Sequence, residues 1–242
     1  MTRQDERARR AEQGPIVAGL PGVPGIGTAL QLTPALGLHL RGLADELLVN
    51  DFAGATIQRH EREMLATATS AANDCFFCMD SHGAFATALL ERDGLSDRAD
   101  LVDVIKQGSS EGFDPKMQAL LHIARTVRGN PLDLTAADVA AAKDAGASDH
   151  DVQLAVLIAA AFCMYNRMVD GFRAMTAPTP EAYRERAGEI AESGYSGTPG
   201  RTTAMMTGGA APAGAEPAGA EPAGAEPAGA EPGAEPAGVG AR

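Results

Sequence analysis

Apolar residues recur every three to four positions along most of this chain, the spacing that places them on one face of an α-helix. No stretch alternates apolar and polar residues as a half-buried β-strand would, so the sequence predicts an all-α fold. The predicted helices cover residues 34–48, 53–72, 75–92, 98–107, 115–127, 135–144, 150–175 and 180–192.

Short polar motifs mark where several of these helices begin. Thr33-Pro34 and Asp114-Pro115 each combine a capping residue with a proline, which the first turn of a helix tolerates. Thr135 and Asp138 have the spacing of a capping box. The middle of the helix at 150–175 is apolar on all sides, which predicts that it is buried among the others.

The two ends of the chain differ in composition from the segment between them. Residues 1–29 are charged at first and then rich in Gly and Pro, which predicts a flexible arm. Residues 196–242 carry little apolar bulk and repeat Ala-Glu-Pro-Ala-Gly in their second half, with glutamates at 216, 221, 226 and 231, which predicts a disordered tail. Residues 30–195 are then the helical domain. The apolar side chains of the arm suit the surface of a second subunit, so we expect a homo-oligomer.

Composition and charge narrow the classes of function. Thirty-two acidic residues against 20 basic ones give a formal net charge of −12, which disfavours nucleic acid and anionic membranes as partners. The longest strongly apolar run, residues 154–164, is too short to span a bilayer. Three cysteines, two of them close together, do not form the framework of a secreted protein, so we expect a cytoplasmic location.

The candidate chemistry lies where two predicted helices meet. Cys75, Cys78 and His82 are spaced three and four residues apart, so they project from one stripe of a helix. A tight turn at Asn73-Asp74 would fold this helix back and bring Glu63 level with His82. An imidazole oriented by a carboxylate can take the proton of a thiol, and a second thiol can trap an oxidised sulfur as a disulfide.

Two observations disagree on which thiol reacts first. Asp74 can cap the helix, which places Cys75 in its first turn, where backbone N–H groups and the helix dipole favour a thiolate. His82 lies one turn after Cys78 and favours that thiol instead.

The order Glu63, Cys75, Cys78, His82 resembles the motif of the AhpD-like alkylhydroperoxidases within the carboxymuconolactone decarboxylase superfamily: a glutamate, eleven residues, C-x-x-C, three residues and a histidine. The Tyr-Asn-Arg-Met-Val-Asp-Gly segment at 165–171 also looks like this superfamily. The resemblance implies an AhpD-like helical bundle that reduces hydroperoxides, with Cys78 oxidised first and Cys75 closing the disulfide. We expect no cofactor. The resemblance implies an external dithiol as reductant, from a lipoyl-bearing protein or in exchange with a peroxiredoxin.

Two other functions stay open at this point. Two thiolates, an imidazole and Glu63 could hold zinc in a helical interaction module. A cofactor-free decarboxylase or lactone-processing enzyme of the same superfamily is the other alternative, although members with that activity generally lack the dithiol. Glu61 is also available as the carboxylate, and we expect it to be a solvated partner of nearby arginines.

Polar and aromatic residues near the motif complete the predictions. Asn166, Arg167 and Asp170 interrupt the buried helix, which predicts a polar cluster in which Arg167 pairs with Asp170. Of Phe76 and Phe77, we expect one to pack in the core and the other to line the entrance of the site.

Overall fold

The computed structural model describes residues 3–17, 25–27, 30, 33–177 and 179–196. The chain divides into two units, Met1–Gly209 and Ala210–Arg242, and every described residue belongs to the first. Part of the predicted arm and all of the predicted tail after Ser196 lie outside the described residues, so those two predictions stay predictions.

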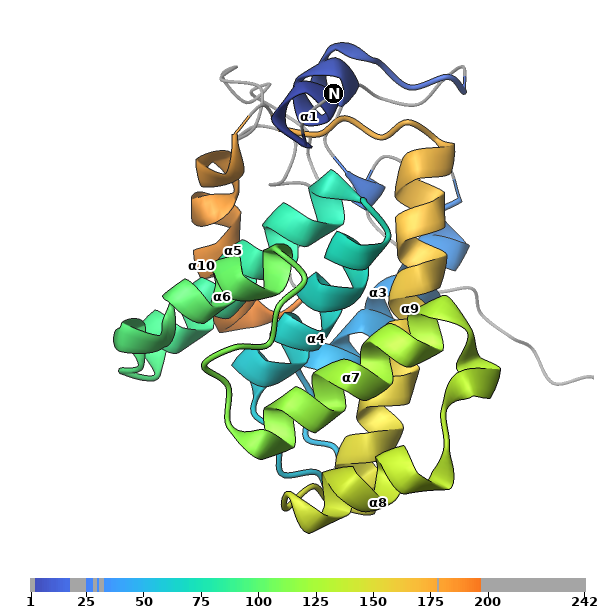
Figure 1. The fold of residues 1–242 in the computed structure, drawn as a ribbon. Coiled ribbons are helices and arrows are strands. Elements are labelled where there is room, and N and C mark those ends of the chain that lie inside the picture. The colour runs from blue at the N-terminus through green and yellow to red at the C-terminus, as the bar shows by residue number, and fades with distance from the viewer. Residues whose placement is uncertain (1–2, 18–24, 28–29, 31–32, 178, 197–242) are drawn as a thin grey trace, which may run out of the picture. The chain divides into compact units, whose positions relative to one another are not determined.

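The prediction of an all-α fold is confirmed, because the described residues form helices and turns and contain no β-strand (Figure 1). The α-helices are α1 (Arg3–Glu12), α3 (Pro34–Leu48), α4 (Arg59–Ala72), α5 (Phe76–Arg92), α6 (Asp100–Lys106), α7 (Pro115–Gly129), α8 (Ala136–Asp144), α9 (Asp149–Gly171) and α10 (Arg184–Ser193). Three short 3-10 turns accompany them: η1 (Ser96–Arg98), η2 (Pro131–Asp133) and η3 (Pro180–Tyr183).

The antiparallel pair of α4 and α5 is the centre of the fold. The helices α7 and α9 pack against α4, and α10 packs along α5 (Figure 1). Leu65 of α4, Leu120 of α7 and Ile158 of α9 are fully buried in the shared core. This arrangement fixes both helices that carry the candidate site.

Helix α9 is long and apolar enough to cross a membrane by length and composition alone. Half of its most apolar window is buried inside the domain, where it packs against α4 and α7. Burial in the core accounts for the apolar character of that half, as the sequence predicts for this helix.

The prediction that one helix begins at residue 53 is wrong, because α4 begins at Arg59. Gly54 has a φ of 83°, which interrupts a helix there. The segment before α4 is instead held by Asp151, whose carboxylate accepts bonds from Thr56 N (2.6 Å), Thr56 Oγ1 (2.7 Å) and Ile57 N (3.0 Å). Glu61 closes a capping box with the Gln58 N–H at 2.7 Å, so it is a buried cap rather than a solvated ion partner.

The turn between α4 and α5 differs from the sequence prediction by one residue. Asp74 does not cap α5: its φ of 54° places it in the left-handed region that ends α4. Cys75 N donates to Ser70 O and Asp74 N to Ala71 O, the two bonds of a Schellman motif. Cys75 is therefore the N-cap of α5, and Cys78 lies in its first turn.

The same motif ends α9 four residues before the predicted end. Arg173 has a φ of 51°, Ala174 N donates to Val169 O, and Arg173 N donates to Asp170 O. The chain then turns back, and Met175 O accepts a bond from Gly25 N at 3.0 Å.

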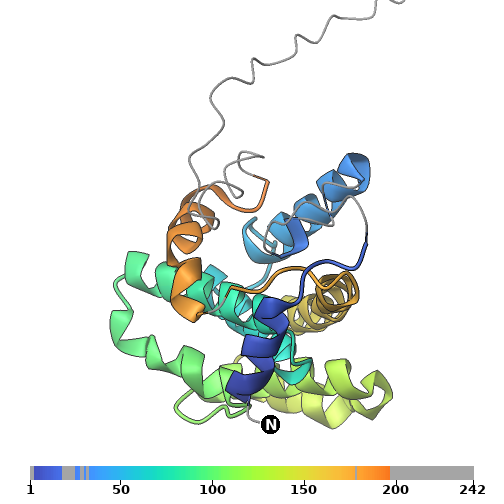
Figure 2. The ribbon, with the colours of Figure 1, turned by 90° about the horizontal axis from the view of Figure 1, so that it is seen from above.

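Helix α1 lies across the ends of the central helices (Figure 2). Arg7 forms an ion pair with the buried carboxylate of Asp80, and Arg10 pairs with Asp170 at 3.0 Å. Both guanidinium groups stand 5.3 Å from the centre of the Phe76 ring. The charged start of the chain is thus attached to the end of the domain that carries Cys75.

Candidate active site

The structure brings Glu63 and His82 into direct contact. Glu63 is fully buried on α4, and its Oε2 lies 2.7 Å from His82 Nδ1 on α5. A carboxylate can only accept here, so Nδ1 carries a proton and Nε2 is the ring nitrogen left to act as a base. The imidazole is therefore oriented as a base whose basic nitrogen is Nε2.

Tyr195 is a third member of this group, and the sequence analysis did not single it out. Its hydroxyl donates to Glu63 Oε1 at 2.5 Å and lies 3.2 Å from His82 Nδ1. Burial and the Glu63 carboxylate raise the pKa of Tyr195 well above its ordinary value, so it stays a donor. The available signal was weak: a tyrosine, one of three in the chain, directly after a glycine where the last predicted helix ends.

Contacts at the end of α10 set the position of Tyr195. Arg59 and Arg92 donate to Ala191 O, both at 3.0 Å, which holds the last turn of the helix. Gly194 follows with a φ of 71°, and a Cβ there would lie 2.8 Å from Asp45. Asp45 of α3 accepts from Tyr195 N at 2.6 Å, so glycine lets the chain turn back over His82.

Aromatic rings enclose the imidazole of His82. Phe162 meets it edge to face with ring centres 4.5 Å apart, Phe85 does so at 5.2 Å, and Tyr195 stacks on it at 5.9 Å. These ring contacts fix the plane of the His82 imidazole, and the hydrogen bond to Glu63 fixes its rotation.

The two candidate thiols are buried, and neither forms a disulfide. Hydrogen bonding to Cys78 and burial raise the pKa of the Cys75 thiol well above its ordinary value, and the nearby Asp170 adds to this. Burial likewise raises the pKa of Asp170, against the opposing charge of Arg10. Cys75 therefore keeps its proton and stands beside Cys78 as a donor.

Cys78 and His82 line the same pocket without a direct hydrogen bond between them in the described part of the chain. The sequence predicts that His82 reaches Cys78, and the structure places both side chains in one pocket without a bond between them. Such contacts are often long in unliganded sites and tighten when substrate is bound.

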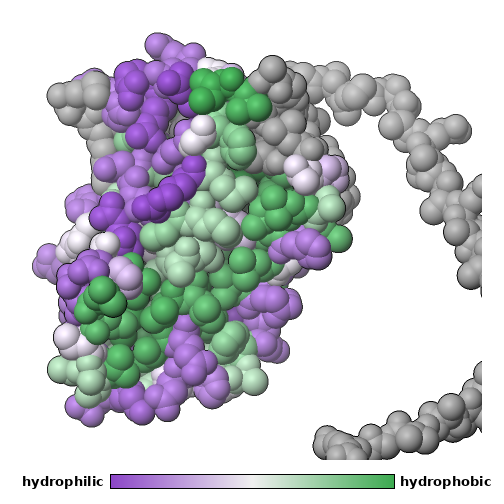
Figure 3. Space-filling model, turned by 90° about the vertical axis from the view of Figure 1, so that its right-hand side faces the viewer, coloured by the Kyte–Doolittle hydropathy of each residue, from purple (hydrophilic) through white to green (hydrophobic). Residues whose placement is uncertain are grey.

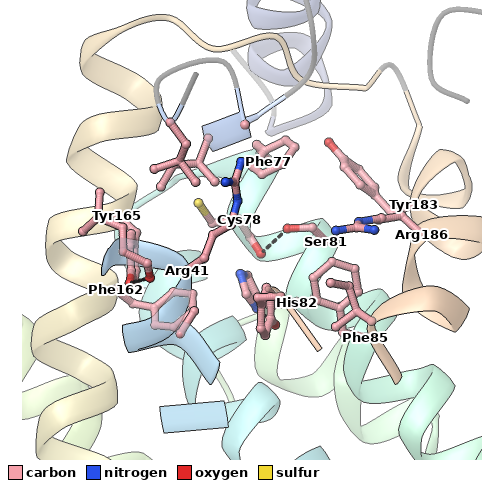
Figure 4. Close-up of a pocket in the computed structure, with 17 residues that line it drawn as sticks. Arg41, Phe77, Cys78, Ser81, His82, Phe85, Phe162, Tyr165, Tyr183 and Arg186 are labelled. Atoms are coloured by element: carbon pink, nitrogen blue, oxygen red, sulfur yellow. Dashed lines mark hydrogen bonds between the residues drawn. The ribbon is translucent and has the colours of Figure 1, made fainter. Parts of the chain in front are cut away.

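The pocket has a volume of about 140 Å³ and is mostly apolar (Figure 4). Ile26, Leu30, Phe77, Phe162 and Tyr183 form much of its wall. Phe76 is buried in a separate small cluster, so the two phenylalanines divide their roles as the sequence predicts. At Gly25 the N-terminal arm packs against the domain of its own chain. The approach is so close that a Cβ at Gly25 would overlap the Phe77 ring.

The polar cluster on α9 is only partly as predicted. Asn166 is buried and bonds to Ser70 Oγ (3.0 Å) and Asn73 Nδ2 (2.8 Å). The predicted pair of Arg167 and Asp170 is wrong: Arg167 is exposed and donates to Cys163 O, and Asp170 pairs with Arg10. Arg167 is the nearer arginine to Asp170 in the sequence, but Arg10 is the one that contacts it in the fold.

No three His, Cys, Asp or Glu side chains in the described segments are grouped so that they could hold a metal ion. Glu63 and Nδ1 of His82 are already bonded to each other. The zinc alternative therefore has no ligand set in this part of the chain.

The fold and the site together indicate the class of protein. The domain is all-α, two cysteines lie at the start of a helix, and one turn later a histidine is bonded to a glutamate. The sequence matches the carboxymuconolactone decarboxylase family over residues 42–126. One similar solved structure is a peroxidase-related protein from Ralstonia eutropha JMP134 with an alkylhydroperoxidase AhpD core. It is 30% identical with a TM-score of 0.52, and the match covers 62% of this chain and 76% of that one.

A peroxidase-related protein from Silicibacter sp. TM1040 shares the fold at 19% identity and a TM-score of 0.54, covering 68% of this chain and 90% of that one. A comparison with curated proteins gave no match. The chain belongs to the carboxymuconolactone decarboxylase family and has its AhpD-like fold.

Proposed function

We propose that this protein is a thiol-dependent peroxidase that reduces hydroperoxides through Cys78 and Cys75. The observation that carries the proposal is the contact of Glu63 with His82 at 2.7 Å, because His82 lines the same pocket as Cys78. The peroxidase-related relatives support the same class of reaction.

The first step is oxidation of Cys78. His82 Nε2 accepts the Cys78 proton, and the thiolate attacks the terminal oxygen of the hydroperoxide, breaking the O–O bond. Cys78 becomes a sulfenic acid, and the leaving alkoxide takes the proton from His82 to become an alcohol. The buried carboxylate of Glu63 stabilises the imidazolium formed in between.

The second step closes the disulfide. Cys75 attacks the Cys78 sulfenic acid, and its proton leaves with the sulfenic hydroxyl as water. The raised pKa of Cys75 supports this order, because a thiol that keeps its proton suits the resolving role better than the attacking one. An external dithiol, as on a lipoyl-bearing protein, then reduces the disulfide and is itself oxidised, and the restored Cys75–Cys78 dithiol can in turn re-reduce a partner peroxiredoxin.

Serine substitutions test these roles. Cys78→Ser should abolish peroxide-dependent thiol loss, because a serine hydroxyl is not ionised by an imidazole. Cys75→Ser should still be oxidised once and leave a sulfenic acid on Cys78, which a dimedone-type reagent traps and mass spectrometry locates. Cys163→Ser is the matched control and should behave as the unmodified protein. A trapped sulfenic acid on Cys75 in Cys78→Ser would reverse the two roles.

A further inference from the structure

Two arginines reach into the apolar pocket from opposite sides. Arg41 comes from α3 and Arg186 from α10, and their guanidinium groups lie near Cys78 and Ser81 (Figure 4). Arg186 is already paired with Glu189 at 2.7 Å. Arg41 is half-buried and makes no hydrogen bond or ion pair with any described residue. A half-buried guanidinium at an apolar wall, with no partner among the described residues, is available to bind a ligand.

The carboxylates around the pocket are committed elsewhere. Glu63 is bonded to His82 and Tyr195, and Asp45 accepts from the backbone of Tyr195 and Ser196. A guanidinium presents five donors in a planar fork that matches a carboxylate in two parallel bonds. The group that would satisfy Arg41 therefore comes from the ligand.

The size of the pocket limits the rest of that ligand. Its volume is about 140 Å³, and an apolar cavity of about 150 Å³ holds one benzene molecule. Phe77, Phe85 and Phe162 supply flat apolar walls. Hydrogen peroxide would leave those walls and Arg41 unused, whereas an aryl or short branched alkyl group fills them.

We infer that the pocket selects organic hydroperoxides that carry a carboxylate, with the apolar body between the phenylalanines, the carboxylate on Arg41 and the peroxide at Cys78. This inference rests on the proposed function. The chemistry is unchanged: Cys78 is oxidised to the sulfenic acid, and the hydroperoxide is reduced to the hydroxy acid with the same carbon skeleton. What the inference adds is the class of substrate.

Single-turnover oxidation of the thiols tests it with three probes: cumene hydroperoxide, its para-carboxylate derivative and the methyl ester of that derivative. We expect the unmodified protein to react with the carboxylate at least tenfold faster than with the ester. In Arg41→Gln this preference should fall below threefold, and in Arg41→Lys it should be intermediate, because an ammonium keeps the charge but not the fork. Arg125→Gln removes an arginine of α7 outside the pocket and should keep the full preference.

The outcomes separate the inference from the proposed function. Equal rates with acid and ester in the unmodified protein, or a preference that survives in Arg41→Gln, would overturn the carboxylate assignment and leave the peroxidase proposal intact. Failure of all three probes to oxidise the thiols would overturn both. The oxidised protein is also reduced with dihydrolipoate and with dihydrolipoamide. A carboxylate preference only in that reductive step would assign Arg41 to the reductant, which contradicts the inference.

Discussion

At the scale of single residues, the site combines a contact that sequence spacing predicts with one that it does not. Glu63 and His82 stand 19 positions apart on a helical hairpin, so their contact follows from the turn between them. Tyr195 reaches Glu63 across 132 positions. Its hydroxyl donates to the second oxygen of the Glu63 carboxylate, so the role of Tyr195 is to position the His82 base.

Tyr195→Phe should slow peroxide-dependent thiol oxidation by about 10- to 100-fold, because a hydrogen bond to a charged group is worth about 1.5–3 kcal/mol and 1.4 kcal/mol is a factor of ten. The pH profile of the rate should move as well, since the carboxylate that orients His82 loses a donor. Stopped-flow oxidation at several pH values measures both.

Tyr165→Phe is the comparison, because Tyr165 donates to Leu40 O at 2.7 Å and contacts neither Glu63 nor His82. It should lower the melting temperature without moving the pH profile. An unchanged profile in Tyr195→Phe would remove the positioning role.

At the scale of elements, Asp151 joins two helices through one carboxylate. It caps α9 by accepting from Ser148 N at 2.9 Å and fixes the segment before α4 through Thr56 and Ile57. These bonds lower the pKa of Asp151 to about 2, against the opposing effect of burial. The start of α4 therefore depends on a residue of α9, which no local pattern reveals.

Asp151→Asn should destabilise the domain by about 2 kcal/mol at neutral pH, because an amide nitrogen would face N–H donors. Since the folded pKa is lowered, the contribution of Asp151 is complete above about pH 4 and lost as the pH falls towards about 2. The stability difference between the two proteins should shrink over that window in urea titrations.

The neighbouring Asp149→Asn serves as control. Asp149 is exposed and forms a surface ion pair with Lys143, so the change should leave the stability of the domain nearly unchanged. A pH-independent difference for Asp151→Asn would mean that its carboxylate charge contributes little.

At the scale of the whole molecule, apolar side chains gather on the side where α3 and α9 lie (Figure 3). Leu36, Leu38 and Leu43 of α3 and Leu157 and Met164 of α9 are exposed. Exposed apolar surface of this kind is typical of subunit contacts.

The homo-oligomer therefore stays a prediction, and these exposed apolar residues are where we expect the subunits to meet. Light scattering at micromolar concentration should show an oligomer, and Leu38→Glu with Leu157→Glu should yield a monomer, because a charge in an apolar interface is not solvated. Leu132→Glu changes a more exposed leucine of η2 and should leave the assembly intact. A monomer in the unmodified protein would exclude this surface as a subunit contact.

Two truncations at the end of the domain should differ sharply. Ending the chain after Ser196 removes residues 197–242, which contain no cysteine or histidine, and should preserve peroxide turnover. Ending it after Gly194 also removes Tyr195 and should reduce turnover as Tyr195→Phe does. Similar rates for the two truncations would show that Tyr195 is dispensable.

The sequence by itself determined the all-α fold, most of its helices and the contact of Glu63 with His82, because these depend on neighbours within a few turns. Capping residues, helix periodicity and the spacing of Glu63, Cys75, Cys78 and His82 are local signals. Tertiary structure alone decided that Tyr195 completes the Glu63 group, that Arg10 rather than Arg167 pairs with Asp170, and that Arg41 lines the pocket with no hydrogen bond or ion pair to any described residue. These contacts join residues far apart in the chain, and the packing of α1, α3 and α10 on the central hairpin selects them among many chemically equivalent partners.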